Sequence, residues 1–166
     1  MRHAIFLEGP IGTGKTTLGR LLAQRLQVSF VDGDDHHVMG RSWFGSALTT
    51  SRGILNAGLS GIETHGKVVI AYPLRCVNWV YYKTHFTRAG VATIFVSLHA
   101  SIEDIAAQGR GRALGDWELA RSCEMSTEGY GSRPFSDLRI ATGGRSVVSS
   151  LAELEASVRR FAGLPC

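Results

Sequence analysis

The chain has 166 residues, of which 44% are hydrophobic and 19% charged, and its formal net charge is +4. This length and composition allow a globular fold with a substantial core, while no apolar run approaches the ~20 residues that span a bilayer. No Lys/Arg run exceeds two residues, and the start lacks the long apolar region of a signal peptide. The three scattered cysteines indicate reduced thiols. We therefore expect a cytoplasmic protein with no nucleic-acid or membrane partner.

Apolar patterns and turn residues predict the elements in chain order. Strands are expected at 3–8, 28–32, 67–72, 91–98 and 137–142. Helices are expected at 14–26, 52–66, 77–90, from Ser101, at 116–125 and from Ser150. Ser101 with Asp104 and Ser150 with Glu153 have the spacing of capping boxes. The alternation predicts an α/β protein with three layers, helices on both faces of a five-stranded parallel sheet, and a ligand beyond the carboxyl ends of the strands.

The stretch "GPIGTGKT" (9–16) matches the phosphate-binding pattern G-x-x-x-x-G-K-[ST] between the first strand and the first helix. Its glycines let backbone N–H groups turn toward phosphate oxygens, and the helix dipole adds positive potential. Lys15 would reach the β- and γ-phosphates, and the Thr16 hydroxyl would hold Mg²⁺. The pattern therefore predicts a nucleotide site.

Carboxylates and imidazoles follow the second strand in "FVDGDDHH" (30–37). Asp32 and Asp34 point to the same side of an extended chain, at the sheet edge that carries the phosphate loop. Phosphoryl transfer needs one carboxylate to orient Mg²⁺ and another to accept the proton of an attacking hydroxyl. A plain turn is the alternative, since Asp and Gly are common turn formers. His36 and His37 have no further metal-ligand pattern nearby, so a loop role is expected, with His37 touching the acceptor.

Two absences narrow the function class. The third strand, "VVIAY", ends without a carboxylate, which argues against motor-type ATPases and moves the metal-orienting role to Asp32. The chain also has no N-K-x-D guanine-reading motif, which argues against a GTPase.

With "GPIGTGKTT" and "VDGDDHH", the chain resembles the small-molecule P-loop kinases, the group of shikimate, gluconate and adenylylsulfate kinases. The resemblance implies a nucleoside-monophosphate-kinase-like fold with a small helical lid. It implies ATP and Mg²⁺ as cofactors, with nucleotide contacts at Gly9, Gly12, Thr13, Gly14, Lys15, Thr16 and Thr17. The D-G-D-x-x-H pattern of gluconate kinases matches Asp32, Asp34 and His37, where Asp32 would serve the metal and Asp34 the acceptor hydroxyl. "AYPLRC" (71–76) departs from the pattern of shikimate and adenylylsulfate kinases, so the acceptor does not carry over.

The segment 108–116 is expected to form the lid, in which Arg110 and Arg112 would stabilise the transferring phosphoryl group. The alternative is a solvated basic turn. In relatives, the loop that corresponds to "ATGGRS" (141–146) wraps the adenine. Arg133 in "SRP" is expected either near the nucleotide or in a structural turn.

From Arg41 to Arg88 the chain has six Lys/Arg and one carboxylate, Glu63. This balance has two interpretations, which the sequence weighs about equally: an anionic partner held by Arg52 or Arg75, or a solvated basic face. Aromatic residues in the same region are expected in the core more often than in an acceptor pocket; they are Trp43, Phe44, Trp79, Tyr81, Tyr82 and Phe86.

The sequence thus predicts one P-loop kinase domain over 1–166, with an acceptor-binding region at 33–66. The expected activity is ATP-dependent phosphoryl transfer to a hydroxyl of a small, anionic metabolite, by a monomer or homodimer. Two alternatives remain open: an antibiotic O-phosphotransferase on the same scaffold, and a nucleotide-binding regulatory protein without transferase activity. The intact pair Asp32 and Asp34 argues against the regulatory protein, which needs no acceptor base.

Overall fold

The computed structural model describes residues 1–37, 43–107 and 113–165, with only the backbone course for 43–45. Its sheet has five parallel strands in the order β2-β3-β1-β4-β5. The strands are β1 (His3–Glu8), β2 (Ser29–Asp32), β3 (Lys67–Ala71), β4 (Ala92–His99) and β5 (Leu138–Ala141). The predicted parallel sheet is confirmed, and β1 lies at its centre because both of its neighbours, β3 and β4, pair with it.

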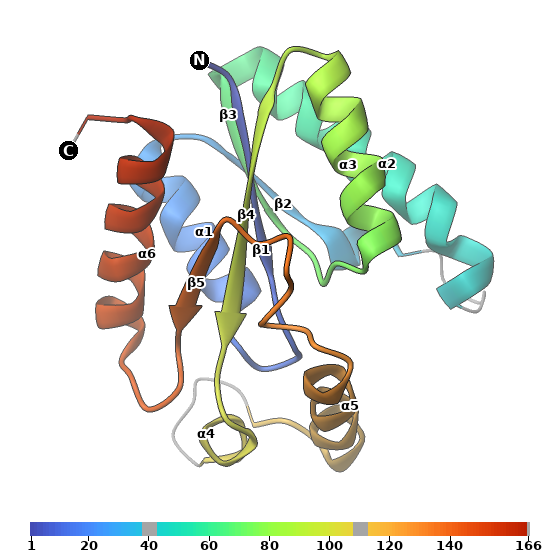
Figure 1. Cartoon of the computed structure of the whole chain (residues 1–166), viewed down its shortest axis with the longest axis vertical. Helices are drawn as coiled ribbons and strands as arrows, with labels where there is room; N and C mark the ends of the chain where they lie inside the picture. The colour runs from blue at the N-terminus through green and yellow to red at the C-terminus, as the bar shows by residue number, and fades with distance from the viewer. Residues whose placement is uncertain (38–42, 108–112, 166) are drawn as a thin grey trace.

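Helices cover both faces of this sheet, as Figure 1 shows. The larger ones are α1 (Lys15–Leu26), α2 (Trp43–His65), α3 (Cys76–Arg88) and α6 (Val147–Ala162). Alternation along β1 sends Ala4 and Phe6 into a cluster with α2 and α3, and Ile5 and Leu7 into a cluster with α1 and α6. The predicted three-layer α/β/α architecture is confirmed.

The remaining helices lie at the carboxyl ends of the strands. They are the 3₁₀ turn η1 (Gly33–His36), α4 (Ile102–Ala106) and α5 (Asp116–Thr127). Figure 1 shows α4 and α5 at the bottom of the view, where the arrows of β4 and β5 point. Residues from distant parts of the chain can therefore meet at this edge of the sheet.

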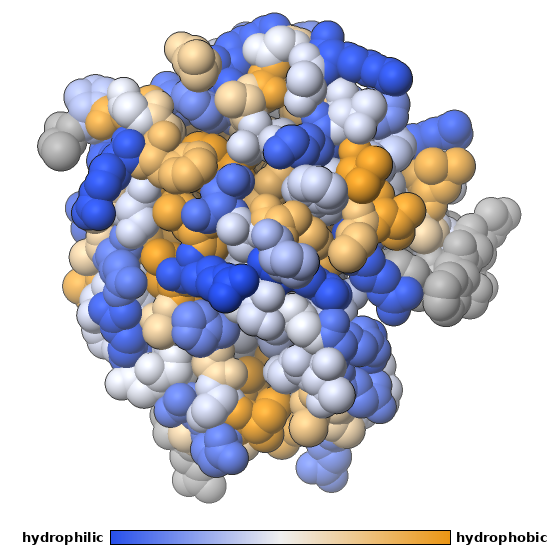
Figure 2. Space-filling model, in the orientation of Figure 1, coloured by the Kyte–Doolittle hydropathy of each residue, from blue (hydrophilic) through white to orange (hydrophobic). Residues whose placement is uncertain are grey.

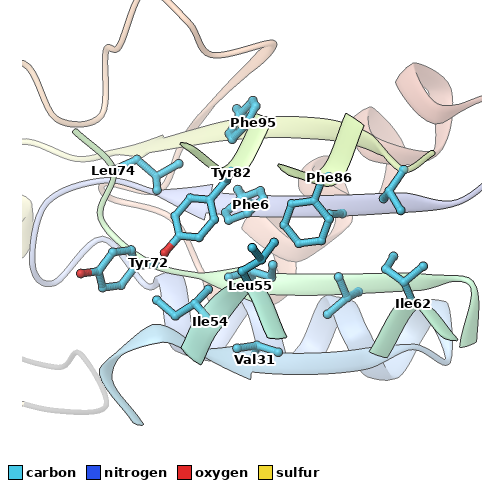
Figure 3. Packing of buried hydrophobic residues seen from close by; sticks show 14 residues of the cluster. Phe6, Val31, Ile54, Leu55, Ile62, Tyr72, Leu74, Tyr82, Phe86 and Phe95 are labelled. Carbon is cyan, nitrogen blue, oxygen red and sulfur yellow. The ribbon is translucent and has the colours of Figure 1, made fainter. Parts of the chain in front are cut away.

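Phe6 lies at the centre of the face covered by α2 and α3, as Figure 3 shows. Its ring is fully buried. Its centroid lies 5.0 Å from that of Tyr82, 5.8 Å from that of Phe86 and 5.1 Å from that of Phe95. The predicted core assignment of Tyr82 and Phe86 is confirmed, and Trp79 and Tyr81 pack against the same cluster. The side chains of Trp43 and Phe44 lie outside the described ones.

Two predicted helix starts are wrong. The helix expected from residue 52 begins at Trp43, because "WFGSALTTS" contains no proline and continues the helix toward its N-terminus. The last helix begins at Val147, one turn before the predicted Ser150. Ser146 is its N-cap, since its side chain accepts a hydrogen bond from the Ser149 N–H, and Ser150 is buried inside the helix. The Ser101 cap, which accepts from the Asp104 N–H, is as predicted.

None of the helices formed by the described residues combines the length and apolar character that a membrane crossing requires.

Phe6→Ala should lower the free energy of unfolding by about 3–5 kcal/mol, because it leaves a cavity among three aromatic rings. Urea denaturation followed by far-UV circular dichroism measures this change. Val80→Ala on α3 is the control: Val80 is exposed, so we expect a change within about 0.5 kcal/mol. A Phe6→Ala protein as stable as the Val80→Ala protein would contradict the assignment of Phe6 to the centre of the core.

Candidate active site

The phosphate loop needs glycine at three positions. Gly9, Gly12 and Gly14 have φ angles of 149°, 84° and 91°, a region that side chains rarely adopt. A Cβ at Gly9 would lie 2.3 Å from the carbonyl oxygen of Leu98. A Cβ at Gly12 would lie 2.7 Å from Ile105 and 2.8 Å from Leu114. The loop is therefore held in close contact with β4 on one side and with the α4–α5 region on the other.

Lys15 is the first residue of α1 and folds back over the loop. Its Nζ donates a 2.7 Å hydrogen bond to the carbonyl of Pro10, which also accepts from the Thr13 hydroxyl at 2.9 Å. Burial lowers the pKa of the Lys15 ammonium to about 8, and the carboxylates of Asp34, Glu8 and Asp32 oppose this shift. A partly buried cation at a helix N-terminus is a favourable place for a phosphate group.

Asp32 ends β2 and caps the 3₁₀ turn that follows. Its carboxylate accepts a 3.3 Å hydrogen bond from the Asp34 N–H and lies 4.0 Å from the Arg20 guanidinium. Gly33 between the two aspartates lies flat on Tyr72, since a Cβ there would come within 2.2 Å of that ring. The D-G-D segment is thus a turn, as one interpretation predicted, but a turn packed against the site.

Asp34 is the aspartate that lines the pocket beside the phosphate loop. Burial raises the pKa of its carboxyl, the negative charge of Asp32 raises it further, and the Lys15 cation opposes both. Asp34 and Asp35 are both exposed, but Asp35 is not among the described residues that line the pocket. Of the three neighbouring aspartates, Asp32 therefore caps the turn, Asp34 lines the pocket and Asp35 does neither.

The pocket has a volume of about 1040 Å³ and runs along the phosphate loop. Its polar lining includes Thr50, Tyr72, Arg75 and Tyr130 as well as Asp34 and His37. Its apolar lining includes Ile11, Leu114, Trp117 and Val147. Lys15 and Thr16 also line it. The arrangement can hold an elongated polyanion between a polar and an apolar partner.

Arg75 lies at the start of α3 and joins two distant parts of the chain. Its Nε donates a 3.2 Å hydrogen bond to the Tyr130 hydroxyl, beyond α5. Arg133, the other arginine considered near the nucleotide, instead donates to the carbonyls of Leu74 and Glu128, at 3.2 and 2.8 Å. Its guanidinium also lies 4.0 Å from the Tyr130 ring centroid, so the described contacts of Arg133 are those of a structural turn.

Most of the predicted site residues line this one pocket: Gly12, Thr13, Gly14, Lys15, Thr16, Thr17, Asp34, His37 and Arg75. Gly9, Asp32 and Arg52 are not among its described lining residues. Gly9 shapes the loop from behind, Asp32 lies beside the pocket, and Arg52 is on the exposed face of α2, which leaves Arg75 as the basic-segment arginine in the pocket. Arg110, Arg112 and Arg41 lie outside the described residues.

His36 packs on α2, where a Cβ at Gly53 would lie 2.9 Å from its Nδ1 atom. Within the ranges that the structure describes, no group of three or more His, Cys, Asp or Glu side chains is placed to hold a metal ion. Any metal here would take its other ligands from phosphate oxygens or water.

Sequence reasoning missed Glu8, a fully buried carboxyl directly before the phosphate loop. Ser97 Oγ donates a hydrogen bond to it and lies 2.6 Å from Ser136 Oγ. Burial raises the pKa of Glu8, and the Ser97 hydrogen bond and the Arg133 and Lys15 cations oppose this. A single carboxylate ending the apolar run "HAIFLE" was the available signal.

Comparison with known proteins places this geometry in context. Residues 11–41 match the model of the family described as shikimate kinase. A shikimate kinase of Psychrobacter cryohalolentis is 64% identical over 31 residues, which are 19% of this chain and 17% of that protein. The chain therefore aligns with about a sixth of the length of that curated relative.

Solved structures extend the likeness to the whole chain. A gluconokinase from Sinorhizobium meliloti 1021 is 19% identical, with a TM-score of 0.68 over 98% of this chain and 96% of that one. An APS kinase from Mycobacterium tuberculosis, in complex with AMPPNP and APS, is 16% identical, with a TM-score of 0.64 over 95% of this chain and 98% of that one. These structures share the fold, and the predicted resemblance to P-loop small-molecule kinases is confirmed.

The depressed pKa of Lys15 makes a prediction about pH. A lysine with a pKa of about 8 loses its charge as the pH rises through that value, so the affinity for a nucleoside triphosphate should fall several-fold between about pH 7 and about pH 9.5. Isothermal titration calorimetry at a series of pH values measures this fall.

Lys15→Arg is the control, because a guanidinium keeps its charge throughout this range. Its affinity should be lower than that of the wild type at pH 7 but should not change with pH. A wild-type affinity that is constant to about pH 9.5 would contradict the assigned burial of Lys15.

Proposed function

We propose that this protein is an ATP-dependent kinase that transfers the γ-phosphoryl group to a hydroxyl of a small, anionic metabolite. The observation that carries this proposal is the placement of the Lys15 cation and the Asp34 carboxylate in one pocket, close enough to shift each other's pKa. A phosphate-binding cation facing a candidate general base is the arrangement that phosphoryl transfer to an alcohol requires.

The comparisons support the same class. The family match covers the phosphate loop and the D-G-D turn, and the solved structures that share the fold include a gluconokinase and an APS kinase bound to AMPPNP and APS. We propose that this chain likewise takes a nucleotide and a second small molecule. We further propose that residues 1–166 act as one kinase domain, in the cytoplasm, as a monomer or homodimer.

The phosphate loop would hold the triphosphate through its backbone N–H groups, and Lys15 would bind the β- and γ-phosphates. Mg²⁺ fits the available donors, because the Thr16 hydroxyl and the Asp32 carboxylate are the hard oxygen ligands it prefers. When bound, Mg²⁺ neutralises charge on the phosphates. Asp32 needs little rearrangement for this role, since the turn it caps already fixes its carboxylate.

Asp34 would act as the general base. The acceptor hydroxyl oxygen forms a bond to the γ-phosphorus, its proton passes to the Asp34 carboxylate, and the bond to the β-phosphate oxygen breaks to release ADP. The raised pKa of Asp34 makes its carboxylate a better proton acceptor than an ordinary aspartate. Its place among the lining residues of the pocket, where Asp32 and Asp35 are not found, supports this role for Asp34.

Arg75 would hold the anionic group of the acceptor. It lines the pocket together with Asp34 and His37, and its hydrogen bond to the Tyr130 hydroxyl orients its guanidinium. A guanidinium is suited to a carboxylate, phosphate or sulfate because it binds two oxygens at once. This placement favours a sugar acid or a similar hydroxylated anion over a cationic aminocyclitol antibiotic.

A coupled ADP-release screen over sugar acids, sugars, nucleosides and aminocyclitols tests the proposed function. ADP release that depends on an anionic hydroxylated compound supports it. Release with aminocyclitols alone would instead indicate an antibiotic phosphotransferase. Tight ATP binding without release for any compound would indicate a regulatory protein.

The three neighbouring aspartates should respond differently to replacement by asparagine. Asp34→Asn should lower turnover ~10²–10⁴-fold while ATP still binds, because general-base assistance is lost. Asp32→Asn should keep the cap, which asparagine also forms, but raise the Mg²⁺ concentration needed for half-maximal rate. Turnover, ATP affinity and Mg²⁺ titrations measure these effects.

Asp35→Asn is the internal control and should stay within a few-fold of the wild type, since Asp35 is not among the described residues that line the pocket. The proposed division of roles is wrong if Asp35→Asn is the most damaging of the three, or if Asp34→Asn is fully active.

Arg75→Ala should raise the KM of the acceptor ~10-fold or more and leave the KM of ATP nearly unchanged, because a charge-assisted bond to the acceptor is lost. Steady-state kinetics with each substrate varied measures the two values. Arg52→Ala removes an arginine of the same basic segment from the exposed face of α2 and should change neither. A neutral or cationic preferred acceptor would contradict the role of Arg75.

A further inference from the structure

Trp117 is an exposed tryptophan at the N-terminal end of α5, and it lines the pocket although 73% of its surface is accessible. Large aromatic side chains on a soluble protein are more often buried, so such exposure beside a pocket suggests a ligand. Ile11, Leu114 and Val147 are further apolar residues that line the pocket. Figure 2 shows apolar surface in the lower part of the molecule, where Figure 1 places α4 and α5.

Helix α5 places Trp117 away from Arg75, the residue proposed to hold the acceptor. Its middle is attached to the phosphate loop, because the Ser122 hydroxyl donates a 2.7 Å hydrogen bond to the Ile11 carbonyl. Beyond its C-terminus, Tyr130 accepts the hydrogen bond from Arg75. A helix of 12 residues is about 18 Å long, so Trp117 lies far from Arg75 and on the other side of the Ser122 attachment.

The segment between β5 and α6 supplies further walls of the pocket. It is joined to the phosphate loop by the Thr142 hydroxyl, which donates a 3.0 Å hydrogen bond to the Thr13 carbonyl. Its conformation is held by Arg145, whose guanidinium donates to the Ala141 carbonyl and to Ser149 Oγ. Val147 follows and lines the pocket, whereas Val148, which is 77% exposed, is not among the described lining residues.

We propose that Trp117 is the residue on which the base of the nucleotide stacks, with Val147 as a further apolar contact. This inference rests on the proposed function. A triphosphate on the phosphate loop would have its γ-phosphate toward Asp34 and therefore its nucleoside away from the acceptor. Trp117 likewise lies away from the Arg75–Tyr130 contact, at the other end of α5. Every nucleobase has flat apolar faces, and stacking on an aromatic side chain is a strong, sequence-tolerant contact. The exposed indole is thus a preformed surface for the base.

Binding measurements with a ligand that has no base isolate this contact. Trp117→Ala should weaken ATP binding about 5- to 100-fold, the usual range for loss of a base–aromatic stack, as measured by calorimetry. It should leave the affinity for inorganic tripolyphosphate within about twofold, since that ligand contacts only the phosphate loop. Trp117→Phe should restore most of the ATP affinity, because a phenyl ring still stacks.

Two neighbouring valines provide matched controls. Val147→Ala should weaken ATP binding a few-fold and leave tripolyphosphate binding unchanged. Val148→Ala removes the same methyl groups one residue further on and should change neither affinity.

Tryptophan fluorescence gives a second readout. ATP should quench the emission of the wild type, tripolyphosphate should not, and Trp117→Phe should abolish the quenching. Of the other two tryptophans, Trp79 packs against Phe135, with ring centroids 5.2 Å apart, so its emission should not respond. Trp43→Phe, in which the quenching by ATP should remain, controls for the other one. The inference is overturned if Trp117→Ala binds ATP as tightly as the wild type. It is also overturned if the emission of the wild type responds to the acceptor and not to ATP. If the wild type binds neither ATP nor tripolyphosphate, the proposed function fails instead.

Discussion

The close contact between Gly9 and the Leu98 carbonyl is the constraint on which the site depends. Because any Cβ at Gly9 would lie 2.3 Å from that oxygen, only glycine lets the chain leave β1 and turn across the end of β4. Two side-chain hydrogen bonds then attach other elements to the same loop, from Ser122 on α5 and from Thr142 after β5. Three separate chain segments, at Leu98 of β4, Ser122 of α5 and Thr142 after β5, thus meet at this one loop, which fixes these walls of the pocket relative to the backbone N–H groups of the loop.

Electrostatics at this edge follows from the same packing. Lys15 is held over the loop where burial disfavours its charge, and three carboxylates, of Asp34, Glu8 and Asp32, restore part of that charge. Glu8 is the most deeply buried of the three, and burial raises the pKa of its own carboxyl. A bound polyphosphate would supply the missing negative charge directly. The site is therefore better balanced with an anion present than without one, as expected for a surface selected to bind phosphate.

The fold could be predicted from the sequence because its signals are local. Continuous apolar runs mark the buried parallel strands, and the caps and glycines mark most helix ends. The start of α6 was misplaced because Ser150 has Glu153 three residues later, the spacing of a capping box, whereas Ser146, the actual N-cap, is followed by Ser149 and lacks that pattern. Within the site, the phosphate loop and Asp34 are readable from motifs. The Arg75–Tyr130 bond and the place of Trp117 in the pocket lining are not, because each depends on the tertiary structure and no local pattern encodes it.

The difference between residues that motifs reveal and residues that only the tertiary structure brings together also explains where sequence similarity ends. The match to shikimate kinases covers residues 11–41, which include most of the phosphate loop, α1, β2 and the D-G-D turn. In the proposed function these elements would bind the triphosphate and accept the proton, chemistry that is the same for any alcohol acceptor. The side chains that would distinguish one acceptor from another come from later segments: Thr50 on α2, Tyr72 and Arg75 around the end of β3, and Tyr130 beyond α5. A chain can therefore keep the catalytic segment of one kinase while its acceptor chemistry is set by residues that lie outside that segment and meet only in the folded structure.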